Sequence, residues 1–225
     1  MNLTNNSNFC LDSEEFGADI AITPQENLVN GVYMAVDATI GYELERLRCK
    51  DGIIPTCKLG CSHCCRFHIP TNIAEAHNLA KFLKRELSAE KINDLRIRTQ
   101  QWHEWNNFML GRYSSADIDE QADLSNYDPC CPLLVNDVCI AYPVRPLICR
   151  THFVCSHPLS CYAANEPEST EDAPIVLTSV LTVTRPFSMK IKDIIEKAGI
   201  NFSRSIMLLP HLLAIEMDWD FVILP

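Results

Sequence analysis

The chain has 225 residues, of which 47% are hydrophobic and 21% charged, a composition typical of a globular protein with a sizeable core. Its formal net charge of −10 argues against a nucleic-acid partner bound through phosphates. No apolar run approaches the roughly 18 residues that span a bilayer, and the polar start does not resemble a secretory signal. We therefore predict a cytoplasmic protein with no membrane partner.

The first half of the chain predicts a loose arm followed by helices. Residues 1–22 are polar and acidic, as expected of an arm without fixed structure. A capping box and apolar residues at helical spacing then predict a helix over Thr23–Arg48. The same spacing predicts helices over Thr71–Leu87 and Ser88–Leu110, the second of which is expected to end at Gly111.

The second half predicts one small hairpin and further helices. Apolar triplets at 133–135 and 138–140 flank Asn136-Asp137, a pair typical of a tight hairpin turn. Residues 175–183 are β-branched and fit either a strand or a helix. Two more helices are expected at Phe187–Ala198 and Ile206–Met217.

These elements predict a mainly α fold, in which a helical bundle carries a small cysteine-rich metal-binding subdomain with a short β-hairpin. The expected organisation is the acidic arm, a metal-binding domain over 23–162, an acidic linker over 163–174 and a helical extension over 175–225. The two tryptophans Trp102 and Trp105 lie on an apolar helix face and are expected in the core.

The cysteines are the unusual feature of the composition. There are twelve, and ten of them fall between Cys57 and Cys161. Disulfides, inert buried thiols and metal ligation are the three alternatives. Disulfide frameworks belong to short exported chains, whereas the adjacent pairs Cys64-Cys65 and Cys130-Cys131 suit clustered thiolates. We therefore favour metal ligation, with the disulfide and inert-thiol readings left open.

Two cysteine groups form the predicted site. Thiolates select zinc, Cu(I) or iron–sulfur centres over hard cations, so the expected cofactor is zinc or iron, including an iron–sulfur cluster. The predicted ligands of the first group are Cys57, Cys61, Cys64 and Cys65, and those of the second are Cys131, Cys139 and Cys149.

The order of these residues resembles the YkgJ-like cysteine-cluster family, described as a zinc- or iron-chelating domain that includes flagellin lysine-N-methylases. The first cysteine group matches the CxxCxxCC part of the family pattern, apart from a three-residue gap after Cys57. The second part is matched by Cys131-Pro132-Leu133-Leu134, Cys139, Tyr142, Arg145-Pro146 and Cys149-Arg150, although Ala141 shifts the tyrosine by one position from the commoner arrangement. The resemblance covers about residues 55 to 155 and implies a metal-chelating domain.

The cysteine motif also permits two enzymatic alternatives to a purely metal-binding module. The spacing of Cys57, Cys61 and Cys64 is that of the radical S-adenosylmethionine motif, although His63 replaces its usual aromatic residue and the barrel pattern is missing. The methylase relatives also suggest an enzyme that modifies a protein substrate, for example by lysine N-methylation. The non-enzymatic hypothesis is a structural or metal-handling module.

The residues around the cysteines have weaker predicted roles. Arg145 and Arg150 either offset thiolate charge, which we favour, or bind an anionic substrate. Cys155 and Cys161 are candidate additional ligands, whereas Cys130 is expected to be a neighbour of Cys131 only. The remaining residues are expected near the site or on the surface: Tyr142, His63, His68 and His152 beside the cysteines, and Cys10 and Cys49 as free thiols.

Overall fold

The computed structural model describes residues 24–115, 130–164, 169–170 and 172–221. The predicted N-terminal arm, Thr23, Cys10 and much of the acidic linker lie outside these residues. The described part is mainly helical, as predicted, with two small two-stranded sheets.

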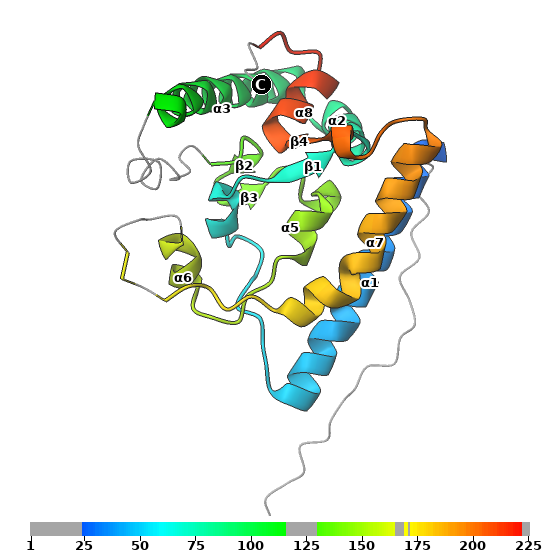
Figure 1. The fold of residues 1–225 in the computed structure, drawn as a ribbon, viewed down its shortest axis with the longest axis vertical. Coiled ribbons are helices and arrows are strands. Elements are labelled where there is room, and N and C mark those ends of the chain that lie inside the picture. Colours follow the sequence, from blue (N-terminus) through cyan, green and yellow to red (C-terminus); the bar gives the residue numbers. More distant parts are fainter. Residues whose placement is uncertain (1–23, 116–129, 165–168, 171, 222–225) are drawn as a thin grey trace, which may run out of the picture.

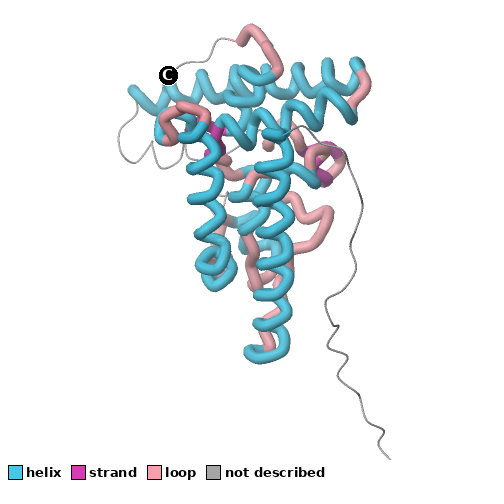
Figure 2. Tube along the Cα trace, turned by 90° about the vertical axis from the view of Figure 1, so that its right-hand side faces the viewer, coloured by secondary structure: helices cyan, strands magenta, loops and turns pink. Residues whose placement is uncertain are grey.

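Two long antiparallel helices form one side of the fold. Helix α1 (Pro24–Arg46) starts where the capping box predicts, and helix α7 (Thr178–Lys197) packs along it (Figures 1 and 2). Their shared face buries Val36, Ile40 and Val180 in the core. This pairing was not predicted, because α7 belongs to the region expected to form a separate C-terminal helical extension.

Helix α1 passes into a π-helical turn, Leu47–Asp51, that carries Cys49. The turn ends at Gly52, whose left-handed φ of 66° lets its backbone N–H bond to Leu47 O. The helical path therefore runs slightly beyond the predicted end at Arg48.

Helices α2, α3 and α8 form a second group. Helix α2 (Ile73–Glu86) is capped by Asn72, whose side chain accepts a hydrogen bond from Glu75 N. Helix α3 (Ala89–Ser115) continues beyond the end predicted at Gly111, since glycine permits a helix to stop but does not force it. Helix α8 (Leu209–Glu216) packs on both, and its buried residues Leu212 and Leu213 belong to the apolar interior.

The region predicted as either strand or helix is helical from Thr178 onwards. Helix α7 also runs through Pro186, although a helix was predicted to start only at Phe187. Pro186 is on the exposed side, while Thr184 is buried and its hydroxyl donates to Val180 O at 2.7 Å. Tertiary packing against α1 therefore outweighs the local cost of the proline.

Short strands and short helices lie between the two groups of longer helices. Strand β1 (Pro70–Asn72) pairs antiparallel with β4 (Ile206–Leu208), with Thr71 opposite Met207. The predicted hairpin is confirmed as β2 (Leu134–Val135) and β3 (Val138–Cys139). The short helical pieces are η2 (His63–Arg66), η3 (Tyr142–Val144), α5 (Leu147–Thr151), α6 (Pro158–Ala163) and η4 (Ser203–Ser205).

Candidate functional site

The two cysteine groups lie against each other, although about 65 residues separate them in the sequence. Cys131 N donates to Cys65 O at 2.8 Å, which joins the two groups through the backbone. Ser62 Oγ donates to Asp137 Oδ1 at 2.7 Å, which ties the first group to the hairpin turn. That turn uses left-handed backbone at Asn136 and Asp137, with φ values of 50° and 60°.

A second set of bonds holds the start of the first group. Thr56 N donates to Val154 O at 2.9 Å, and Thr56 Oγ1 donates to Ser156 O at 2.7 Å. In return, Val154 N donates to Cys57 Sγ at 3.4 Å. The loop that carries Cys57 is therefore fixed to the segment that follows Cys149, and not only to its own neighbours in sequence.

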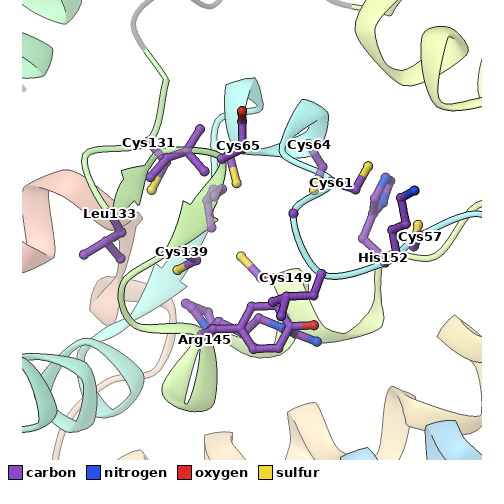
Figure 3. Close-up of a pocket in the computed structure, with 18 of the residues that line it drawn as sticks. Cys57, Cys61, Cys64, Cys65, Cys131, Leu133, Cys139, Arg145, Cys149 and His152 are labelled. Atoms are coloured by element: carbon purple, nitrogen blue, oxygen red, sulfur yellow. The ribbon is translucent and has the colours of Figure 1, made fainter.

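All seven predicted ligand cysteines line one cavity of about 130 Å³ (Figure 3). Figure 3 shows the sulfurs of Cys65 and Cys149 pointing into its central space from opposite sides. Tyr142, Arg145 and His152 line the same cavity. The shared location predicted for the two cysteine groups is thus present in the fold.

The cavity does not contain a formed coordination sphere. Among the residues that the structure describes, no three His, Cys, Asp or Glu side chains are gathered closely enough to hold a metal ion. No disulfide links any of the described cysteines. The sulfurs share a cavity, and binding one ion through several of them requires side-chain rotation.

Burial keeps most of these thiols protonated. It raises the pKa of Cys131 to about 12 and holds the pKa of Cys139 and of Cys149 above the usual thiol range, with neighbouring thiols adding to the effect. Cys64 is the exception, because a hydrogen bond from Cys65, with a smaller contribution from the positive charge of Arg145, lowers its pKa to about 7.

Arg145 and Lys58 are the arginine and lysine side chains among the residues that line the cavity, and Arg145 lies beside the cysteines of the second group. Its guanidinium lies over the Tyr142 ring at 3.7 Å from the ring centroid. Its Nε is buried and has no hydrogen-bond partner within the described residues. Its charge lowers the pKa of both Cys64 and Cys139, which is the effect expected of a residue that offsets thiolate charge.

Arg150 has a different environment. It is buried but does not line the cavity, and its Nη1 donates to Asp37 Oδ2 at 2.6 Å. Its Nε donates to Arg145 O at 2.8 Å and its Nη2 donates to Pro143 O, while the guanidinium lies 4.1 Å from the centroid of the Tyr33 ring. These contacts join α5 to α1, so Arg150 stabilises the position of the helix that carries Cys149.

Glu75 supports the site and was not among the predicted residues. Its buried carboxylate accepts hydrogen bonds from Leu147 N at 2.7 Å, Asn72 Nδ2 at 2.6 Å and the Tyr33 hydroxyl at 3.0 Å. Leu147 begins the helix that carries Cys149, so Glu75 fixes that helix from α2. A glutamate on an otherwise apolar helix face is the only sequence signal for it.

The remaining described cysteines and His63 do not line the cavity. Cys130 is half-buried beside Cys131, and Cys155 Sγ lies 3.8 Å from Ile175 O. Cys49 is exposed, with its sulfur 3.1 Å from Glu45 Oε1. Cys161 is buried on α6, and the ring of His63 lies 5.9 Å edge-on from that of Tyr162 on the same helix.

His68 belongs to a second group of titratable residues, which we call the histidine cluster: His68, His103 and His211 with Trp102 and Trp105. The rings of His103 and His211 are 4.7 Å apart between centroids, and Trp102 lies edge-on to all three histidines. Burial lowers the pKa of His68 and of His211 to about 4 and also lowers that of His103. Trp102 is buried there, as predicted.

Comparisons with protein-family models, with curated proteins and with solved structures found no match. The resemblance to the YkgJ-like family accordingly remains a prediction from the motif residues. None of the helices in the described part of the chain is both long and apolar enough to cross a membrane.

Proposed function

We propose that this protein binds zinc or iron, the latter as an ion or an iron–sulfur centre, in the cavity lined by the two cysteine groups. The observation that carries the proposal is the meeting at one cavity of seven cysteines from two groups that are far apart in the sequence. Thiolates are the donors that zinc and iron–sulfur centres take in proteins. Segments so distant in sequence share a cavity only because the fold holds them there.

The electrostatics of the cavity support binding of a cation. Burying thiolates and bringing several of them together without a cation is costly, and the pKa values of Cys131 and Cys149, raised first by burial and then by the neighbouring thiols, express that cost. A dication removes it, and each ligating thiol then releases its proton to solvent. Cys64, with its pKa of about 7, is the thiol best prepared to bind first.

A histidine beside the cysteines also supports metal binding. His152 lines the cavity, and its buried Nε2 has no hydrogen-bond partner among the described residues. An unpaired buried ring nitrogen is destabilising, and metal ligation would satisfy it. Enzymatic use of the centre, such as lysine N-methylation of a flagellin-like substrate, stays a prediction of the family resemblance.

Elemental analysis with an absorption spectrum of anaerobically purified protein tests the proposal. We expect at least one equivalent of zinc or iron per chain in the wild type and in the exposed control Cys49→Ser. The triple variant Cys131→Ser, Cys139→Ser, Cys149→Ser should retain less metal. A folded wild-type protein that neither carries zinc or iron nor takes up added Zn²⁺ would contradict the proposed function.

A further inference from the structure

A second cavity, which we call the aliphatic cavity, lies where the start of α1 and the end of α7 approach α2 and α8 (Figure 1). Its volume is about 440 Å³, against about 130 Å³ for the cavity lined by the cysteines, and the two have no lining residue in common. Ligand sites in proteins have volumes of roughly 300–1,000 Å³. The aliphatic cavity is therefore large enough for a small organic molecule and separate from the cysteine cavity.

Saturated hydrocarbon makes up most of the wall of this cavity. Val29 and Ile195 line it and are buried, whereas Leu28 and Ile200 line it with 53% and 43% of their surface exposed. None of the described residues that line it is a phenylalanine, tyrosine or tryptophan, so a planar ring would find no stacking partner there. An aliphatic chain in the cavity would instead remove the exposed surface of Leu28 and Ile200 from water, which is favourable.

Four polar residues also line the aliphatic cavity: His77, Asn78, Lys197 and Glu216. His77 Nδ1 lies 2.7 Å from Glu216 Oε2, so this carboxylate already has a partner. Asn78 Nδ2 likewise donates to Asn30 Oδ1 at 2.9 Å. Lys197, the last residue of α7, has no carboxylate partner within the described part of the chain. The charge left to meet a ligand is therefore positive.

We propose that the aliphatic cavity binds an aliphatic monocarboxylate, with the hydrocarbon chain against the apolar wall and the carboxylate at Lys197. The apolar wall selects a flexible saturated chain, and the single unpaired ammonium selects one negative charge. A lysine binds a carboxylate as a point charge on a flexible stem, so it sets the sign of the head group more than its shape. Chain length then contributes most of the affinity, because each methylene group that enters the cavity leaves water.

Isothermal titration calorimetry of the full chain with decanoate tests this inference, and we expect one molecule to bind per chain. A buried methylene changes the affinity about fourfold, so octanoate should bind roughly 15-fold more weakly than decanoate. Decan-1-ol has the same chain without the charge and should bind roughly three- to fivefold more weakly. Lys197→Gln should remove the difference between decanoate and decan-1-ol while both still bind.

A variant that fills the cavity shows where decanoate binds. Ala74 lines the cavity and is half-buried, so Ala74→Phe should abolish binding. Ala38, which is exposed on α1 and does not line the cavity, is the matched control, and Ala38→Phe should bind decanoate as the wild type does. If circular dichroism shows that Ala74→Phe does not fold, Ala198→Phe replaces it, since Ala198 lines the cavity at an exposed position.

Three results would overturn the inference. The first is absence of decanoate binding to the wild type up to the micelle concentration of decanoate. The second is unchanged binding in a folded cavity-filling variant, which would place the ligand elsewhere. The third is binding of decan-1-ol or decyltrimethylammonium as tight as that of decanoate, which would exclude an anionic ligand. Metal content, measured on the same samples, should not change with decanoate, because the two cavities share no lining residue.

Discussion

The cysteine cavity and the histidine cluster both concentrate titratable side chains, but only the cavity has the features of a ligand site. In the cavity, loops and short helices present thiols and one histidine to a shared space beside a cation, Arg145. In the histidine cluster, the rings of His103 and His211 pack directly on each other, Trp102 packs edge-on to all three histidines, and His103 Nε2 lies 3.2 Å from Pro210 O. Proximity of potential ligands is thus not enough, because the space between them must be left open for an ion.

Metal removal should give the largest difference between the two regions. Structural metal sites contribute on the order of 10 kcal/mol to folding, and here that energy would act on the loops 50–70 and 130–157. After chelation we expect amide hydrogen exchange to rise first in these loops, while α3 and α8 around the histidine cluster stay protected. Simultaneous release of the whole chain would show that the two regions are not separable.

Arg150→Ala should be the most destabilising single substitution near the cavity. It removes the contact with the half-exposed Asp37 and the two bonds to backbone carbonyls, and each buried acceptor left without its donor costs about 1–3 kcal/mol. Urea unfolding should show this loss, with partial rescue by Arg150→Lys. Arg85, which is exposed and forms an ion pair with Glu86, is the matched control. Arg85→Ala should lower the free energy of unfolding by about 0–1 kcal/mol. Equal effects of the two substitutions would mean that α5 does not depend on Arg150.

Acid should weaken the histidine cluster. The pKa of His211 is about 4 in the folded protein and about 6.5 in an unfolded chain, so the unfolded state binds more protons between these values. Stability should therefore fall as the pH drops below about 6.5, by up to about 1.4 kcal/mol per pH unit for each such histidine. Urea unfolding between pH 7 and pH 5 measures this slope, and His211→Phe should reduce it. An unchanged slope in that variant, or a reduced slope in the exposed control His157→Asn, would contradict the assignment.

Alkali should weaken the cysteine cavity of the metal-free protein by a similar amount. Unfolded thiols lose their protons near pH 8.5, whereas the pKa values of Cys131 and Cys161 are about 12 and 11 in the folded protein. The folded state then binds more protons, and stability should fall by up to about 1.4 kcal/mol per pH unit per thiol as the pH rises through this window. Cys131→Ser should flatten the slope measured by urea unfolding. Bound metal should reverse the trend, because acid protonates its ligands.

The smallest expected effect concerns the reactivity of Cys64. Without Arg145 the pKa of this thiol should rise from about 7, and a rise of one unit lowers the thiolate fraction at pH 7 about fivefold. Alkylation of the metal-free protein by iodoacetamide, mapped by mass spectrometry, should slow at Cys64 in Arg145→Gln. Cys65→Ala should slow it further, since the hydrogen bond from Cys65 is the larger cause. An equal change in the control Arg66→Gln would point to a general charge effect.

The sequence by itself determined the local elements. Asn72 and the apolar spacing after it predict α2, and Asn136-Asp137 predicts the hairpin turn, because caps, turns and periodicity depend only on nearby residues. The cysteine spacing likewise predicted which residues would line the cavity. No comparable local signal marks where a helix tolerates proline or glycine. The predicted start of α7 and the predicted C-terminal end of α3 were therefore wrong.

Tertiary structure alone decided what surrounds these elements. The pairing of α1 with α7, the bond from Leu147 N to Glu75 and the attachment of Arg150 to Asp37 join residues far apart in sequence. Spacing along the chain carries no information about such pairs. Arg145 and Arg150 both lie near Cys149 in the sequence but have different roles. Burial and interaction partners, which only the folded chain provides, decide which groups each charge acts on and how strongly.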